Sequence, residues 1–155
     1  KAMLHFKQLD ITSSDFPRNV FLLDGWGAVL TAIMHGAVLT RYEQVFGMPK
    51  TILFSLGAIA CCFAAFSLTN AFRTSPNWRS NLLGIAIANL CFCVVSIGFV
   101  FYFFSRISNL GFAYFAIEVL VVVVLAWFEI KVAWRSISKY AIPKARIKMM
   151  TTLSI

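Results

Sequence analysis

Four long apolar runs constrain the fold of this chain more than any other feature. They cover residues 21–40, 51–72, 82–104 and 111–128. An α-helix needs about 20 mostly apolar residues to cross the hydrocarbon core of a bilayer, and each run is close to that length. The runs therefore predict an all-α membrane protein with four transmembrane helices.

The links between the runs are short and contain helix-ending signals. In "RYEQVFGMPK", Gly47 can end one helix and Pro49 can begin the next. The segments "RTSPNWRSN" and "SRISNLG" separate the other runs. Short links make neighbouring helices run antiparallel, so we expect an antiparallel up-down bundle of four transmembrane helices with a basic C-terminal helical extension.

On this interpretation the chain has three parts. Residues 1–20 form a polar N-terminal segment, residues 21–128 form the four-helix domain, and residues 129–155 form a basic amphipathic tail. We expect the fourth helix to continue into the tail and to end at Pro143, because proline disrupts a helix interior.

The composition also favours lipid as the solvent. The chain is 60% hydrophobic and 13% charged, whereas a soluble domain carries about 25% charged residues. A formal net charge of +8 would suggest nucleic acid as the partner of a soluble protein. Here the positive residues lie mostly near the chain ends, which indicates anionic lipid headgroups and no nucleic acid.

Lysine and arginine are distributed unevenly between the two sides of the predicted bundle. One side receives the N-terminal segment, the second link and the tail, whereas the other receives Arg41, Lys50 and Arg106. Positive charge concentrates on the cytoplasmic side, so both termini are predicted to be cytoplasmic. The tryptophans fall on or near the same side: Trp26, Trp78, Trp127 and Trp134.

The basic residues of the tail are predicted to contact anionic lipid headgroups. The alternative is that they are ordinary flanking charge of a membrane helix. They are Lys131, Arg135, Lys139, Lys144, Arg146 and Lys148.

Small residues at four-residue spacing predict close contacts between helices. In lipid, such residues let two backbones approach closely, either inside one bundle or between protomers. They are Ala28, Ala32 and Gly36 in the first run, Gly57, Cys61 and Ala65 in the second, and Gly84, Ala88 and Ser96 in the third.

Two pairs of cysteines lie near the middle of their runs, Cys61 with Cys62 and Cys91 with Cys93. Neighbouring positions on a helix diverge by about 100° and alternate positions by about 200°, so neither pair can converge on one ion. We interpret the cysteines as small packing residues. The sequence predicts no metal site and no cofactor.

Six polar residues inside the runs are the candidates for function. Ionisable groups inside a membrane are expensive and often mark ion or proton paths. Asp24 to His35 and Glu118 to Glu129 are both separations of 11 residues, which is close to three helical turns. The candidates are Asp24, His35, Asn70, Asn89, Glu118 and Glu129.

Counting along the helices predicts two polar layers. His35 and Glu118 reach a similar depth in an outer layer, and Asp24 and Glu129 lie near the cytoplasmic edge with Asn70 beside them. The functional interpretation is a proton or small-cation path, because two carboxylates held close share a proton or a cation. The structural interpretation is that these groups form hydrogen bonds across helices and fix their register.

The segments "LLDGWGA", "RYEQVFGMPK", "NWR", "IAIANLCFC" and "NLGFAYFAIEV" resemble a group of small bacterial integral membrane proteins with four spans. The resemblance covers roughly residues 20–132. The resemblance implies the fold and a location in the inner membrane of a bacterium, and it brings no activity, cofactor or substrate. Asp24, Asn89, Glu118, Glu129 and the turn at Gly47 match the group's pattern, whereas His35 does not.

Two functions remain open at the level of sequence. The chain has no phosphate-binding loop, zinc-protease motif or nucleophile elbow, so we expect no enzyme. The first hypothesis is an accessory, scaffold or self-associating subunit, as a homo-oligomer or within a larger membrane complex. The alternative is a carrier or channel for protons or small cations that uses the carboxylates of the first and fourth helices.

Overall fold

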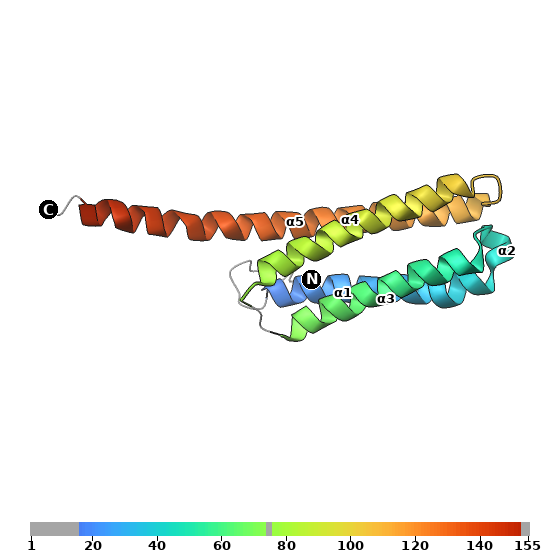
Figure 1. Ribbon diagram of the computed structural model, residues 1–155, viewed down its shortest axis with the longest axis horizontal. Coiled ribbons are helices and arrows are strands. Elements are labelled where there is room, and N and C mark those ends of the chain that lie inside the picture. The colour runs from blue at the N-terminus through green and yellow to red at the C-terminus, as the bar shows by residue number, and fades with distance from the viewer. Residues whose placement is uncertain (1–15, 74–75, 153–155) are drawn as a thin grey trace, which may run out of the picture. The chain divides into compact units, whose positions relative to one another are not determined.

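The computed structural model describes residues 16–73 and 76–152, with side chains at 17–73 and 76–134. The described residues form helices joined by short turns, with no strand among them. The elements are α1 (Phe16–Ile33), the π-helix η1 (Met34–Leu39), α2 (Glu43–Phe46), α3 (Lys50–Phe72), α4 (Trp78–Tyr102) and α5 (Asn109–Thr152), as labelled in Figure 1 apart from η1. The predicted all-α fold is confirmed.

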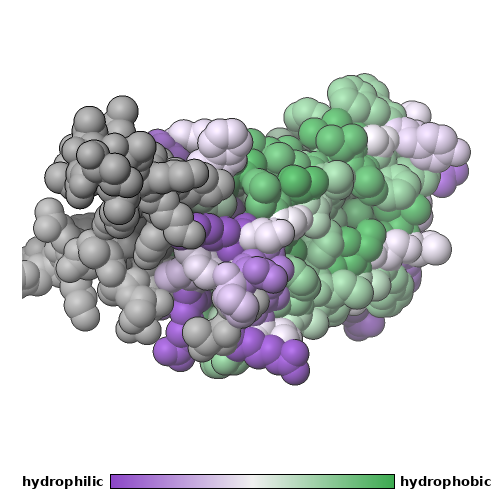
Figure 2. Space-filling model, turned by 60° about the vertical axis from the view of Figure 1, so that its left-hand side comes forward, coloured by the Kyte–Doolittle hydropathy of each residue, from purple (hydrophilic) through white to green (hydrophobic). Residues whose placement is uncertain are grey.

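Four helical segments are long and apolar enough to cross a membrane: Pro17–Leu39, Lys50–Phe72, Trp78–Tyr102 and Asn109–Trp134. Many of their large apolar side chains face outward, among them Leu30, Val94 and Phe101. Figure 2 shows a broad hydrophobic area on one face, with hydrophilic residues towards its ends. The chain is therefore a multi-pass membrane protein, and the four predicted spans are confirmed.

The described helices belong to two compact units. The first unit contains α1, η1 and α3, and the second contains α2, α4 and α5. In each unit two membrane-spanning segments run antiparallel as a helical hairpin. The short helix α2 follows η1 in the sequence, yet it packs within the second unit.

Small residues bring the helices of the first unit close together. A Cβ atom added to Gly57 would lie 3.3 Å from the Gly36 nitrogen and 3.5 Å from the Ala32 carbonyl oxygen. A Cβ atom at Gly25 would lie 2.8 Å from the Leu68 side chain. Close backbone approach of this kind is the expected way for helices to associate in lipid.

The buried face of α3 differs from the predicted one. Gly57 is buried as expected, but Cys61 and Ala65 are exposed. Strict four-residue spacing drifts around a helix of 3.6 residues per turn, whereas alternating steps of three and four stay on one face. The buried small residues follow the alternating pattern: Gly57, Ala60, Ala64, Ser67 and Ala71.

The turn around α2 is held tightly within the second unit. Gly47 ends α2 with a left-handed φ of 80°, and the Ser108 nitrogen donates a 3.2 Å hydrogen bond to the Phe46 carbonyl oxygen. A Cβ atom at Gly111 would overlap that same oxygen. Glycine at position 111 thus lets α5 begin directly against the α2 turn.

The last helix is longer than the sequence predicted. We expected it to end at Pro143, but α5 continues to Thr152. Proline removes one backbone hydrogen bond and does not necessarily end a helix. The residues that follow include alanine, arginine, lysine and methionine, which are strong helix formers.

We predict that Gly111→Ala destabilises the protein. The new methyl group would meet backbone atoms that cannot rotate away, so the free energy of unfolding should fall by about 1–3 kcal/mol. Chemical unfolding in detergent micelles measures the change. Gly84→Ala is the matched control, because nothing lies within 4 Å of a Cβ atom there. Equal stability of the two variants would contradict the close packing at Gly111.

Candidate functional site

The polar candidates lie mainly on the buried faces of the membrane helices. Asp24, His35, Asn89, Glu118 and Glu129 are all buried. Asn70 is half-exposed, and its Nδ2 donates to the Phe66 carbonyl oxygen of its own helix at 2.9 Å. Because unsatisfied polar groups are costly in lipid, their local contacts indicate what each can do.

Asp24 forms a direct bond between the two helices of the first unit. The Ser67 hydroxyl on α3 donates to Asp24 Oδ2 on α1, and both side chains are buried. Ser67 lies nearly one turn before Asn70, the residue expected beside Asp24. A hydroxyl that donates to a carboxylate is one of the stronger hydrogen bonds available to a side chain. The bond fixes the register of α1 against α3.

His35 lies inside the π-helix η1 and is fully buried. Its Nδ1 is 3.0 Å from the Thr31 carbonyl oxygen. A carbonyl oxygen only accepts, so Nδ1 carries the proton in this contact. The Thr40 hydroxyl donates to the His35 carbonyl oxygen at 2.6 Å, five residues back along the chain.

The wide π turn explains how His35 fits beside α3. A π-helical turn contains one more residue than an α-helical turn, and such turns frequently occur at functional sites. Here the turn brings Leu39 and Thr40 onto the buried side after His35. The tightest contact of a Cβ atom added to Gly57 would be 3.3 Å, to the Gly36 nitrogen, and the His35 Cβ atom would lie at an ordinary contact distance of 3.5 Å.

Glu118 is the centre of a second group of polar atoms, on α4 and α5. The Tyr114 hydroxyl makes a long hydrogen bond of 3.5 Å to Glu118 Oε1. Cys93 of α4 donates weakly from Sγ to the carbonyl oxygen of Val119, the residue after Glu118, at 3.9 Å. The ring of Phe46 meets Tyr114 edge-on, with centroids 6.0 Å apart.

The two predicted polar layers each join residues of different units. Asp24 and His35 belong to the first unit, whereas Glu118 and Glu129 belong to the second. The pairings His35–Glu118 and Asp24–Glu129 therefore stay predictions. Within their own units, Asp24 is held by Ser67 and Glu118 by Tyr114.

Several polar residues of these groups were missed in the sequence. They look ordinary there, because serine, threonine and tyrosine are common in membrane helices. The signal that could have identified Ser67 is alternating three- and four-residue spacing on a face that also holds glycine and alanine. The missed residues are Thr31, Thr40, Ser67 and Tyr114.

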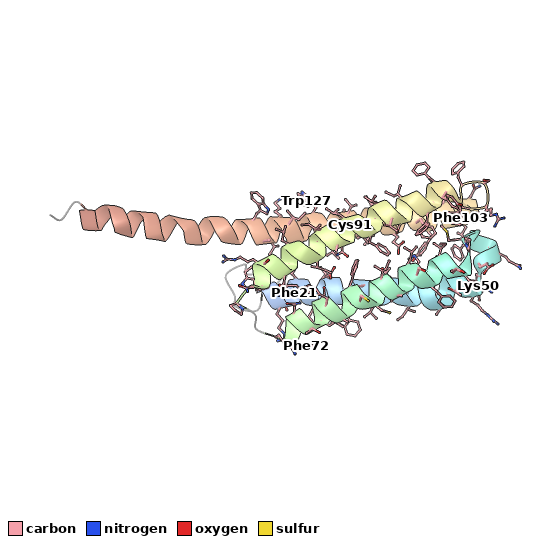
Figure 3. All side chains as sticks on the ribbon, in the orientation of Figure 1. Phe21, Lys50, Phe72, Cys91, Phe103 and Trp127 are labelled. Carbon is pink, nitrogen blue, oxygen red and sulfur yellow. The ribbon has the colours of Figure 1, made fainter. Side chains whose placement is uncertain are left out.

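The cysteines do not form a cluster. Cys61, Cys62 and Cys91 are exposed and Cys93 is buried, and all four are free thiols. Figure 3 labels Cys91 partway along α4. Among the side chains that the structure describes, at residues 17–73 and 76–134, no group of three or more His, Cys, Asp or Glu is arranged to hold a metal ion.

Lys131 is the predicted headgroup contact whose side chain the structure describes. Lys131 is exposed, and its Nζ lies 4.3 Å from the centre of the Trp127 ring. Trp127 is exposed near the end of the apolar part of α5 (Figure 3). The side chains of Arg135, Lys139, Lys144, Arg146 and Lys148 lie outside the described residues.

No protein-family model, curated protein or solved structure matches the chain. The resemblance to small bacterial four-span proteins therefore stays a prediction, and function has to be inferred from the residues themselves.

We predict that Asp24 and Ser67 stabilise the first unit as a coupled pair. Ser67→Ala should lower the free energy of unfolding by about 1–3 kcal/mol, because a buried carboxylate oxygen loses its donor. In a double-mutant cycle with Asp24→Ala, the coupling energy should be about 1 kcal/mol.

The matched control for this cycle is Ser55→Ala. Ser55 is exposed on the same helix, and its hydroxyl donates to the Thr51 carbonyl oxygen of that helix. Its loss should leave stability nearly unchanged. Strictly additive effects of Asp24→Ala and Ser67→Ala would argue against the bond as a register lock.

Proposed function

We propose that the protein is a non-enzymatic membrane subunit that associates with a second copy of itself through α3. The observation that carries this proposal is a row of small, exposed residues along that helix. They follow alternating steps of three and four residues, which keeps them on the face opposite the buried one. They are Thr51, Ser55, Ala58, Cys62, Ala65 and Thr69.

The exposed face of α3 differs from those of the other membrane helices. The outward faces of α1, α4 and α5 are rich in bulky side chains such as Leu30, Val94 and Leu120, which suit contact with lipid chains. On α3 the larger Phe54 and Phe66 flank the small residues. A groove of small residues between larger ones favours close contact with another helix in a bilayer.

A second copy of this chain is the occupant that best fits the row. A two-fold interface uses the same surface on both partners, and two-fold dimers are the commonest oligomers. Two α3 helices can place their small residues against each other, as α1 and α3 do at Gly57 within one chain. The lack of motifs for nucleotides, zinc or a catalytic nucleophile supports a role without catalysis.

We also propose that both termini are cytoplasmic and that the protein contacts anionic lipid headgroups on that side. The excess of lysine and arginine on one side supports cytoplasmic termini in a bacterial inner membrane. Exposed Trp26, Trp127 and Trp134 support an interfacial belt on that side. The contact of Lys131 with the Trp127 ring holds a positive charge at the same level, where anionic headgroups would lie.

Disulfide crosslinking tests the α3 interface. Two variants keep a single cysteine each, Cys62 or Cys91, with the other three replaced by serine. Both thiols are exposed and lie near the middle of their spans, so they have equal access to an oxidant that enters the bilayer. We expect a covalent dimer from Cys62 at several times the yield from Cys91, measured in native membranes by non-reducing electrophoresis.

A steric variant adds an independent readout. Ala65→Leu should abolish the Cys62 crosslink by filling the groove, whereas Ala116→Leu on the exposed face of α5 should not. Equal crosslinking from Cys62 and Cys91 would rule out α3 as the interface. A Cys62 adduct with a mass other than twice that of the chain would show a different partner and overturn self-association.

A second candidate function is transport of protons or small cations. The observation that favours it is the burial of Asp24, Glu118 and Glu129 in membrane-spanning helices, where carboxylates are rare and usually functional. The bond of Asp24 to Ser67 supports a structural role for that carboxylate. Glu118 is therefore the more promising transport residue.

Reconstituted liposomes test the second candidate. If the chain conducts, flux should exceed that of protein-free liposomes, and Glu118→Gln should reduce it at least about tenfold, because the exchangeable charge is lost. Glu43→Gln is the control, since Glu43 lies in α2 outside the spans. Flux that is equal in Glu118→Gln and the unaltered protein would assign the Glu118 carboxylate a structural role.

A further inference from the structure

The hydroxyl of Ser96 on α4 is buried without a hydrogen-bond partner. Its side chain is 0% exposed, and within the described part of the chain no donor or acceptor pairs with Oγ. Other hydroxyls in these helices bond to the carbonyl four residues back, as Ser55 and Thr69 do. A buried hydroxyl without a partner costs about 1–3 kcal/mol, so the Ser96 hydroxyl is available to bind a ligand.

The contact between Cys93 and Val119 gives the register of α4 against α5. The two helices are antiparallel, so a later position on α4 lies beside an earlier position on α5. Ser96, one turn after Cys93, is therefore level with Phe115, one turn before Val119. Ser96 is also within about 60° of Cys93 around the helix axis. Ser96 therefore lies on the same side of α4 as Cys93, the residue that contacts α5.

The carboxylate of Glu118 reaches the same level. Long side chains on a helix lean towards its N-terminus, so the Glu118 head lies over the preceding turn. The contact of Oε1 with the Tyr114 hydroxyl agrees with that direction. The Ser96 hydroxyl on α4 thus lies at a similar level to the Glu118 carboxylate and the Tyr114 hydroxyl on α5.

The chemistry of this group fits a hard cation. A carboxylate and two hydroxyls offer oxygen ligands, which alkali and alkaline-earth ions prefer over nitrogen or sulfur. The group supplies one negative charge. A monovalent ion neutralises that charge, whereas a divalent ion would leave a net positive charge buried in the bilayer.

We propose that α4 and α5 bind one monovalent inorganic cation between Glu118, Ser96 and Tyr114. Glu118 supplies the charge, and the two hydroxyls supply neutral oxygen ligands. The site lies entirely within the second unit, so it depends neither on contact between two α3 helices nor on transport across the membrane. Binding gives the unpaired Ser96 hydroxyl its partner.

Thermal unfolding of the full chain in detergent tests the site. The protein is prepared in choline chloride, whose cation is too large for the group, and is titrated with sodium, potassium or lithium chloride at constant ionic strength. We expect at least one of these ions to raise Tm saturably. Ser96→Ala should weaken the response about tenfold in half-maximal concentration, in line with other losses near bound ions.

Two further variants make the result specific. Glu118→Gln should abolish the ion-dependent rise in Tm, and Ser80→Ala, at an exposed position of α4 outside the site, should leave it unchanged. If Glu118→Gln does not fold, the ratio of responses between Ser96→Ala and Ser80→Ala decides. The proposal is overturned if no small ion differs from choline, if the effect survives both site variants equally, or if only pH alters Tm.

Discussion

The absence of water in the bilayer core governs this structure. Each polar group within a membrane helix must find its partner in its own helix or in a neighbour, because solvent cannot supply one. Asp24 finds Ser67 on the adjacent helix, and His35 finds the Thr31 carbonyl on its own. Those contacts place polar side chains on buried faces, and the remaining faces are free to be apolar.

The same constraint explains why small residues matter so much in this chain. Lipid chains are as apolar as leucine, so the hydrophobic effect does not drive two helices together in the membrane. Close backbone approach has to supply the attraction, as it does where Gly57 meets Ala32 and Gly36. On α3 small residues lie on two opposite faces, one buried within the hairpin and one exposed. A helix built this way can serve two contacts.

Hydropathy and short links were sufficient to predict four spans and antiparallel neighbours, but not how each helix is rotated. A helix that is apolar all round carries no period that marks its buried face, so the four-residue spacing misplaced Cys61 and Ala65 on α3. The π turn at Met34–Leu39 and the continuation of α5 past Pro143 also escaped prediction. The π turn and the continued helix both depend on the local backbone conformation. The same residue types are compatible with an α-helical turn or with a helix that ends at the proline.

The serine of the first unit, Ser67, and the serine of the second unit, Ser96, differ in their relation to a buried carboxylate. In the first unit, Ser67 donates directly to Asp24, so the hydroxyl and one carboxylate oxygen satisfy each other. In the second unit, the Ser96 hydroxyl lies at the level of Glu118, and among the described residues nothing pairs with it. Serine rotates freely about χ1 and could bond to its own helix, as Ser55 does. The Ser96 hydroxyl forgoes this bond at the level of a carboxylate, and this difference from Ser67 is the basis for proposing that it binds a ligand.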